Sequence, residues 1–369
     1  MDDISLIIPT HFRHPFLSRA LDYYQKSAFK IYVVDSSKNA FEDKSKYGDI
    51  VYLHFPGATY LDKMKIAFSR VNTKYSFICA DDDFISIESV KKCALYLEKN
   101  QDYSSIQGHY IGFHYPSSLA PYPMYLPILN LNISDNSPVD RLNNLLTNYM
   151  FHYYSVHRSS FLKYFYEEIT PKLSLDLFRL GDNSSSNVIE LANTIGSLIN
   201  GKHRVLPIFY CARDASTTVP DATGAIQRRE LINIQKRNQD YYENFVTTMA
   251  DFFSKKHSIT KNEAKLELGK FLQKYYEIRS RIMKTRLSTQ TKKLTKLSLF
   301  KTLLKNILPL YFIDKLKNQI YKKRTNGIQG FPFSDKESGK QWREMKKVIC
   351  RHDIDYSKSN KDYFNHWYY

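Results

Sequence analysis

The sequence contains no uninterrupted apolar run of the roughly 18 residues that a transmembrane helix requires. Its N-terminus carries neither a basic segment nor an apolar one before a cleavage site, so no signal peptide is expected. The 369 residues include only four cysteines, and none of them shows the paired spacing of metal ligands. Scattered cysteines of this kind are typical of reduced cytosolic thiols. We therefore expect a cytoplasmic protein without a membrane-spanning segment.

Acidic residues are scarce in the last third of the chain. Residues 251–369 hold 28 basic and 11 acidic residues, whereas residues 1–250 hold 26 of each. The segment 279–324 carries 14 basic residues and one acid, and its apolar residues Leu297, Phe300, Leu304 and Ile307 recur at helical spacing. A basic amphipathic helix is typical of an element that binds an anionic membrane surface. The alternative is a helical bundle that packs its apolar face on the rest of the protein.

Three consecutive aspartates, Asp81, Asp82 and Asp83, follow an apolar run over residues 75–80 that reads as a buried strand. Three adjacent carboxylates repel one another in a partly buried site unless a cation neutralises them. Mg²⁺ and Mn²⁺ prefer oxygen ligands, and Mg²⁺ characteristically bridges carboxylates to phosphates. The triplet therefore suggests a metal site. The alternatives are a solvated turn, or an aspartate that caps a helix beginning near Ser86.

Strands and helices alternate through the first 80 residues. Apolar runs at 4–8, 31–34 and 50–55 precede the run at 75–80, and helical patterns occupy 16–25 and 60–71. This alternation predicts an α/β fold with a mostly parallel sheet, whose ligands bind beyond the carboxyl ends of the strands. Thr10, Arg13, Asp35 and the aspartate triplet all fall at such ends. The loop IPTHFRHP after the first run has no glycine, which argues against the phosphate loop of a sugar-nucleotidyltransferase.

The order IPTHFR, VVDSS and then an apolar strand ending in ADDDF resembles the nucleotide-binding half of GT-A glycosyltransferases. It is most similar to inverting family 2 and the related bacterial surface-glycan transferases, and the resemblance spans about residues 4–215. It implies a Rossmann-like GT-A catalytic domain with a nucleotide-sugar donor and a divalent metal. The helical, basic segment would then be a C-terminal extension of that domain.

The resemblance also implies roles for the residues at the first two strand ends. Thr10 and Arg13 match positions that contact the nucleotide, and Asp35 matches the aspartate that contacts the base. The second acidic position of that motif is Ser36 here, which leaves the identity of the base open.

The aspartate triplet can be aligned with the family in two registers. In one, Asp81 and Asp83 form the outer pair of an Asp-x-Asp motif; in the other, Asp82 and Asp83 match a trailing Asp-Asp. In either register Asp83 is the expected metal ligand, and Asp81 or Asp82 lies near the ribose, with Asp81 a second candidate ligand. Lys63 and Lys65 on the preceding helix are candidates for phosphate contacts, or else belong to a solvated helix face.

An inverting transfer needs a carboxylate within hydrogen-bond reach of the acceptor hydroxyl. In family 2 this base stands about eleven residues before a glycine and a strand. Gly201 and the apolar run after it match that glycine and strand, and counting back eleven residues gives Glu190. Asp182, in a polar stretch, is the rival candidate. The alternative to a catalytic role is an exposed position on a helix for Glu190, and a turn or helix N-cap position for Asp182.

Two further segments are candidates for the site. Arg213, after the strand at 205–210, suits the donor diphosphate because a guanidinium pairs bidentately with phosphate. Asp214 is a candidate third metal ligand. The aromatic stretch 148–158 would line the acceptor cleft, with a half-buried strand as the alternative, and its His152 and His157 are interpreted as structural.

We expect three regions: a GT-A domain over 1–225, a helical basic region over 226–324 and a tail over 325–369. The predicted function is metal-dependent transfer of a sugar from a nucleotide-sugar to a surface-glycan or lipid-linked acceptor, at the inner face of the cytoplasmic membrane. A nucleic-acid-binding protein would also carry a basic, aromatic segment, but it would not need the acidic cluster at a strand end. The donor sugar, the acceptor and the oligomeric state are not readable from the sequence.

Overall fold

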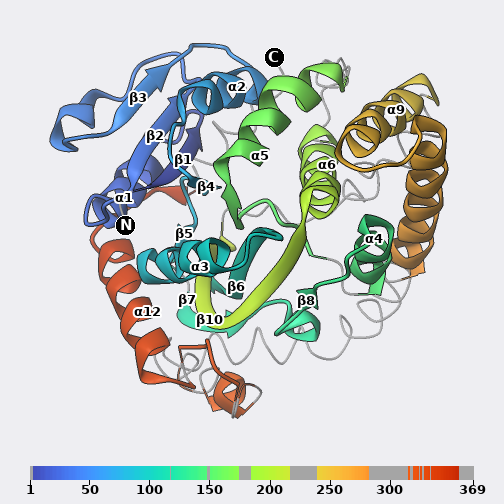
Figure 1. Ribbon diagram of the computed structural model, residues 1–369. Coiled ribbons are helices and arrows are strands. Elements are labelled where there is room, and N and C mark those ends of the chain that lie inside the picture. Colours follow the sequence, from blue (N-terminus) through green and yellow to red (C-terminus); the bar gives the residue numbers. More distant parts are fainter. Residues whose placement is uncertain are drawn as a thin grey trace, which may run out of the picture.

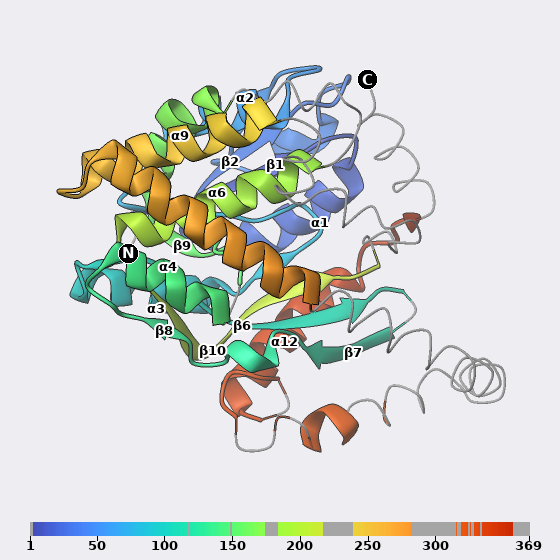
Figure 2. The ribbon, with the colours of Figure 1, turned by 90° about the vertical axis from the view of Figure 1, so that its right-hand side faces the viewer.

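The computed structural model describes residues 3–116, 118–147, 150–173, 184–216 and 239–281, and from the C-terminal part 315, 319–323, 325, 328–332 and 334–356. Within these residues ten strands form one sheet, and helices cover it (Figures 1 and 2). The α/β class with a mostly parallel core, predicted from the alternation of strands and helices, is confirmed.

The first four strands are parallel and lie in the order β3-β2-β1-β4. They are β1 (Ile4–Thr10), β2 (Lys30–Asp35), β3 (Val51–His54) and β4 (Tyr75–Ile78), with α1 (His14–Tyr24) after β1 and α2 (Tyr60–Arg70) after β3. Each element lies where the sequence predicts it. Because the strands are parallel, the ends of β1, β2 and β4 meet at one edge of the sheet.

The second half of the sheet is mixed. β9 (Val156–Arg158) is antiparallel to both β4 and β6 (Tyr103–His114), and β6 is parallel to β10 (Lys202–Asp214). Three short strands complete the sheet: β5 (Phe84–Ile85), β7 (Ser118–Pro123) and β8 (Asn132–Ile133). The helices of this half are α3 (Ile87–Lys99), α4 (Pro138–Thr147), α5 (Ser159–Tyr164), α6 (Ser184–Asn200), α9 (Gln239–Lys256) and α12 (Lys336–Ile349).

Apolar residues cover both faces of the sheet. Successive side chains of a strand point to opposite faces, and on β2 the residues Tyr32 and Val34 belong to one buried cluster while Ile31 and Val33 belong to another. The first cluster includes residues of α2, α5, α6, α9 and the helical residues 261–281. The second includes residues of α1, α3 and α12, and Figure 1 shows α12 beside α1.

Local capping fixes where two of the helices begin. The Thr59 side chain accepts a hydrogen bond from the backbone N–H of Asp62 at the start of α2, and Ser86 does the same for the N–H of Ser89 at the start of α3. The helix predicted near Ser86 is therefore capped by that serine. The alternative in which an aspartate of the triplet is the cap is wrong.

Most of the basic segment 279–324 lies outside the described residues, so its helical and membrane-surface interpretations stay predictions. No helix in the described part of the chain is long and apolar enough to cross a membrane. The predicted boundaries at 225 and 325 also stay predictions. The described helices beyond these boundaries nevertheless contact elements of the first region: α9 contacts α6, and α12 contacts α1 and β10.

Candidate active site

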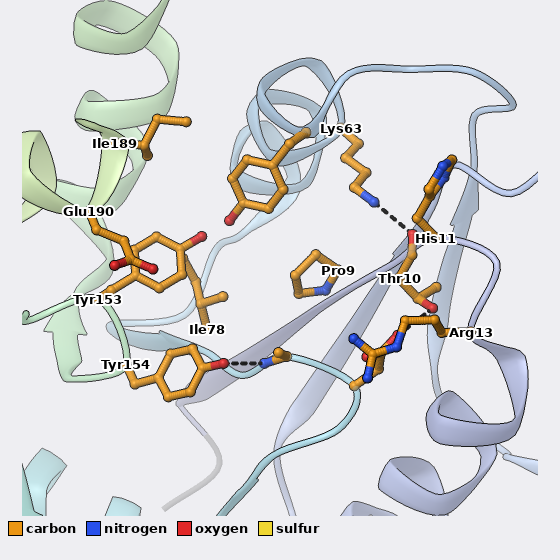
Figure 3. A pocket seen from close by; sticks show the side chains of 13 residues that line it. Pro9, Thr10, His11, Arg13, Lys63, Ile78, Tyr153, Tyr154, Ile189 and Glu190 are labelled. Carbon is orange, nitrogen blue, oxygen red and sulfur yellow. Dashed lines mark hydrogen bonds and ion pairs between the residues drawn. The ribbon is translucent and has the colours of Figure 1, made fainter. Parts of the chain in front are cut away.

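A pocket of about 180 Å³ opens at the carboxyl ends of β1 and β4. Thr10, His11 and Arg13 form one side of it, while Tyr153, Tyr154 and Glu190 face them from the α6 side (Figure 3). The remaining lining residues are Pro9, Tyr60, Lys63, Ile78, Ala80, Asp81 and Ile189. Predicted site residues from four separate segments of the sequence therefore share one cavity.

Asp81 and Asp82 are held by residues from the loop after β1. The Thr10 hydroxyl donates to Asp81 Oδ2 at 2.7 Å, and Arg13 lies with Nε 3.4 Å from Asp81 Oδ1 and Nη2 2.7 Å from Asp82 Oδ2. All four side chains are buried. Burial raises the pKa of Asp81 to about 6, and the charge of Arg13 opposes that rise. Arg13 thus neutralises part of the charge that the triplet would otherwise concentrate.

Asp83 points to the other side of the sheet end, toward β10. Its Oδ2 accepts hydrogen bonds from the Tyr154 hydroxyl at 2.9 Å and from Arg213 Nε at 3.2 Å, and its Oδ1 accepts from the backbone N–H of Asp214 at 2.9 Å. Burial raises the pKa of Asp83 to about 6, against the lowering effect of Arg213. The sequence assigned Arg213 to the donor diphosphate, and its contact with Asp83 was not anticipated.

The two lysine candidates have different environments. Lys63 is buried, and its Nζ donates to the backbone carbonyl of Thr10 at 2.6 Å and to the Ser36 hydroxyl at 3.0 Å. Burial lowers the pKa of Lys63 to about 8, while Asp35 and Asp81 oppose that shift. Lys65 is exposed on α2 and does not line the pocket. The structure brings only Lys63 to the site.

Asp35, the expected contact to the base, is completely buried. Its Oδ1 accepts from the backbone N–H of Ser37 at 2.8 Å, while its Oδ2 lies 2.8 Å from His14 Nε2 and accepts from the Tyr52 hydroxyl at 2.6 Å. Burial alone would raise its pKa, but these hydrogen bonds outweigh burial and hold the pKa at about 2. Both oxygens already serve the fold, so a direct contact to the base would require one of these partners to move.

Glu190 has a different environment. It lies in α6, in the wall of the pocket, and among the described residues no side-chain hydrogen bond or ion pair involves its carboxylate. Burial raises its pKa to about 7, and the nearby charge of Arg213 opposes the rise. Glu190 therefore changes its charge near neutral pH. Asp182, its rival as the base, lies outside the described residues.

The spacing argument that selected Glu190 has a physical basis at Gly201. This residue joins α6 to β10, and a Cβ atom added there would lie 2.8 Å from the backbone oxygen of Asp102. Only glycine fits this approach of the two chain segments. The register between α6 and β10 is thereby fixed, and it places Glu190 beside the pocket rather than on the outer surface.

A second, smaller hollow of about 60 Å³ adjoins the first and shares Tyr153, Tyr154 and Glu190 with it. Its other lining residues are Tyr110, Tyr125, Met150, Phe151 and Arg213. Residues 150–154 are thus a loop that lines both hollows, and the strand β9 begins only at Val156. The aromatic stretch accordingly faces the cavity, as the cleft interpretation expects.

The histidines of that stretch lie behind the pocket. His152 stacks on His203 with ring centroids 3.6 Å apart, and His157 Nε2 lies 2.8 Å from the backbone oxygen of His152. All three are fully buried. Burial lowers the pKa of His152 well below its ordinary value, that of His157 to about 4 and that of His203 to about 3. Neutral, packed imidazoles of this kind agree with the structural interpretation.

The chemistry of the acidic residues suits a hard cation, but their arrangement divides them. Asp83 bonds to Arg213 and Tyr154, while Asp214 Oδ2 lies 3.2 Å from Arg19 Nη2. In the part of the chain that the structure describes, no three His, Cys, Asp or Glu side chains surround a point that a metal ion could occupy. Mg²⁺ needs only one or two carboxylates when phosphates complete its shell. Asp83, Asp81 and Asp214 therefore stay candidate ligands, and each of them already has hydrogen-bond or ion-pair partners.

Some residues of the site were not anticipated from the sequence. His11 Nδ1 lies 2.9 Å from the Ser36 hydroxyl, His14 pairs with Asp35, and Arg19 donates to the backbone oxygen of Asp82 at 3.0 Å. His11 and His14 flank Arg13 in the loop already selected, so their position was a usable signal. Arg19, by contrast, reads as an ordinary position of an amphipathic helix.

No protein-family model matches the sequence, and no curated protein matches it. Among solved structures, it is similar to the crystal structure of S. aureus TarS residues 1–349, with a TM-score of 0.43 and 12% identity over 77% of this chain and 92% of that chain. The complex of TarS 1–349 with UDP-GlcNAc gives the same values. The crystal structure of S. aureus TarS gives a TM-score of 0.39 and 13% identity over 75% of this chain and 55% of that chain. At these values the likeness does not identify a function, so the interpretation of the site depends on its own residues.

Proposed function

We propose that the protein is a GT-A glycosyltransferase that transfers a sugar, with inversion, from a nucleotide-sugar to a surface-glycan or lipid-linked acceptor. One observation carries the proposal. A carboxylate that titrates near neutral pH, Glu190, faces the strand-end residues Thr10, Arg13 and Asp81 across a single pocket. The sequence resemblance assigned the strand ends to the donor and Glu190 to the base, and these residues belong to separate segments of the chain that line the same pocket.

In this proposal Glu190 takes the proton from the acceptor hydroxyl. The hydroxyl oxygen then bonds to the anomeric carbon of the donor sugar, and the bond from that carbon to the diphosphate oxygen breaks. A raised pKa suits this task, because a carboxylate with a pKa near 7 is a better proton acceptor than an ordinary one and is still about half ionised at neutral pH. The aromatic rings of Tyr153 and Tyr154 would support the sugar between the two hollows.

The leaving nucleoside diphosphate carries the negative charge that the reaction releases. Arg13 and Lys63 line the pocket on the strand side, and Arg213 lies in the adjoining hollow. These cations stabilise charge that develops on the diphosphate, in a site where burial strengthens the interaction. Mg²⁺ or Mn²⁺ held by Asp83 with Asp81 would add a further positive charge when bound.

A thermal-shift screen tests the donor. The full-length protein is melted with a panel of nucleotide-sugars that includes UDP-GlcNAc, each with and without Mn²⁺. A donor that binds the native state raises the melting temperature as its concentration rises. Release of the nucleoside diphosphate from the stabilising donor then shows that the donor is consumed, and release that increases when an acceptor is added shows transfer. If no nucleotide-sugar stabilises the protein and none is consumed, the proposal is wrong.

We further propose that the basic segment 279–324 brings the enzyme to an anionic membrane that presents its acceptor. Lysines near an anionic leaflet contribute about 1 kcal/mol each, and salt screens this attraction. The full-length protein should sediment with phosphatidylglycerol vesicles at low salt and not with phosphatidylcholine vesicles.

The charge of the segment can be tested without deleting any of it. A variant with four lysines of the segment changed to glutamate should no longer sediment with the anionic vesicles. The four positions are Lys292, Lys293, Lys296 and Lys301. A matched control changes four exposed lysines of the N-terminal half, Lys26, Lys38, Lys44 and Lys99. If the control loses sedimentation equally, binding follows net charge alone. If the wild-type protein ignores anionic vesicles, the membrane proposal fails.

A further inference from the structure

The residues after α12 return to the back of the acidic cluster. α12 itself is held by apolar contacts, since Trp342, Met345 and Ile349 are buried in the same cluster as residues of α1 and β10. The chain then continues to Tyr356, whose ring packs edge-on against Phe16 of α1 with centroids 5.2 Å apart. A segment some 140 residues distant from Asp214 in sequence is thereby placed against the floor of the site.

Tyr356 makes two polar contacts there. Its hydroxyl donates to Asp214 Oδ2 at 2.5 Å and accepts a hydrogen bond from Arg19 Nη1 at 2.7 Å. Arg19 is completely buried, and its Nη2 also bonds to Asp214 Oδ2 and to the backbone oxygen of Asp82. The hydroxyl therefore completes a closed set of hydrogen bonds among three elements: α1, the end of β10 and the C-terminal segment.

This set is connected to Asp83 through the backbone. The N–H of Asp214 donates to Asp83 Oδ1 at 2.9 Å, so the position of Asp214 determines one of the contacts that orient Asp83. Arg19 also holds the carbonyl of Asp82, the residue between Asp81 and Asp83. Tyr356 is thus connected to the triplet in two ways, through Asp214 to Asp83 and through Arg19 to Asp82. Tyr356 itself does not line the pocket.

We propose that Tyr356 is a positioning residue for the acidic cluster and that residues 350–356, which follow α12, belong to the donor site. This inference rests on the proposed function, because the cluster matters to turnover only if it holds the donor. Hydrogen bonds to charged groups are the stronger ones, and a side chain displaced from its place loses part of the binding that its geometry provides. We therefore expect a substitution of Tyr356 to weaken donor binding although Tyr356 does not line the pocket.

The test compares two variants of the same segment. Tyr356→Phe removes only the hydroxyl and should raise KM for the donor about ten-fold, the loss expected for one hydrogen bond to a charged group. His352→Ala removes the contact of His352 Nε2 with Asp22 Oδ2, 2.8 Å long, on the outer side of α1. Both variants should melt at a somewhat lower temperature, but His352→Ala should keep the wild-type KM. Equal KM values for the two variants would overturn the inference.

A double-mutant cycle separates positioning from general loosening. If Tyr356 acts through Asp214, then Tyr356→Phe in an Asp214→Asn background should cost little more in kcat/KM than Asp214→Asn alone. His352→Ala should leave kcat/KM unchanged both in the wild-type and in the Asp214→Asn background. Fully additive costs for Tyr356→Phe would show that it acts elsewhere.

Hydrogen exchange gives a readout that does not depend on turnover. The amide of Asp214 should exchange faster in Tyr356→Phe than in His352→Ala, because its acceptor Asp83 is less well held. Unchanged exchange of that amide would overturn the inference even where KM moves. If the wild-type protein binds no nucleotide-sugar, the proposed function fails; if it binds one and Tyr356→Phe behaves as wild type in both assays, the inference alone fails.

Discussion

The two sides of the pocket treat their carboxylates in opposite ways. On the strand side, Asp35, Asp81 and Asp83 are buried and each accepts at least two hydrogen bonds or ion pairs. On the helix side, Glu190 faces the same pocket and, within the described residues, its carboxylate has none. Burial favours the neutral form of both Asp35 and Glu190, and only at Asp35 do hydrogen-bonding partners outweigh it.

The pKa values follow this contrast. Three hydrogen-bonding partners hold the pKa of Asp35 at about 2 despite its burial, whereas burial with no such partner raises that of Glu190 to about 7. A carboxylate that is held by several donors has a fixed position, and Asp35 in addition stays ionised. Asp81 and Asp83 are held in the same way, although burial raises their pKa values to about 6. A carboxylate without donors can exchange its proton near neutral pH. The strand side is therefore built to position a ligand, and the helix side to move a proton.

The largest effect is expected on the strand side. Asp83→Ala should abolish transfer and with it metal-dependent stabilisation by the donor, because it removes both the expected metal ligand and the partner of Arg213. The measurements are turnover and thermal shift with the donor in the presence of Mn²⁺. Asp43→Ala is the control, since Asp43 pairs with Lys46 at the surface. A folded Asp83→Ala variant with wild-type turnover and unchanged metal dependence would contradict the metal assignment.

The helix side should give the complementary phenotype. Glu190→Gln should retain the thermal shift with donor but lose at least about 10²-fold in kcat, the usual contribution of a general base. Glu168→Gln, at a residue that pairs with Lys172 on the surface, is the control. If Asp83→Ala and Glu190→Gln both lose donor binding, the assignment of donor binding to the strand side and of proton transfer to Glu190 is wrong.

The pH dependence sharpens the same contrast. A base must be deprotonated to act, so kcat/KM of the wild-type enzyme should fall as the pH decreases through about 7, the pKa to which burial raises Glu190. In Glu190→Gln this step should disappear. The remaining loss should lie near pH 6, where Asp81 and Asp83 take up protons. If kcat/KM of Glu190→Gln still falls as the pH decreases through about 7, another residue is the base.

The strand side was readable from the sequence because its signals are local. Each candidate stands at the end of an apolar run, and parallel strands bring such ends together whatever the details of packing. Thr10, Arg13 and the triplet were found in this way, and Lys63 followed from its place on the intervening helix. The sequence did not reveal that Arg13 would bond to Asp81 and Asp82, because a side-chain pairing depends on rotamers and on which neighbours are buried.

The helix side was only partly readable. Glu190 was selected by its distance from Gly201, a signal whose cause is the contact of that glycine with the Asp102 backbone. On the strand side, Arg19 and Tyr356 carried no signal in the sequence, because their hydrogen bond joins residues 337 positions apart. Long-range hydrogen bonds of this kind arise only after the sheet and both helix layers have assembled.

The smallest expected effect concerns what supports the helix side. The backbone N–H of His152 donates to the Thr194 hydroxyl, which in turn donates to the backbone oxygen of Glu190. The buried histidines behind this link must stay neutral for the wall of the pocket to keep its packing. Burial lowers the pKa of His157 to about 4, whereas an imidazole in the unfolded chain titrates near about 6.5.

The sign of the resulting pH dependence follows from proton binding. Between about pH 6.5 and 4 the unfolded chain binds a proton at His157 and the folded protein does not. This histidine therefore lowers the free energy of unfolding as the pH falls through that window.

Denaturant unfolding at several pH values measures this effect. The slope of the free energy of unfolding against pH should be steeper for wild type than for His157→Gln by up to one proton, about 1.4 kcal/mol per pH unit. Comparing slopes rather than absolute stabilities is necessary, because Glu190, Asp81 and Asp83 have raised pKa values and act in the opposite direction. If the free energies of unfolding of wild type and His157→Gln change in parallel with pH, His157 takes up its proton in the folded state as well. The buried histidine behind the helix side of the pocket would then be charged.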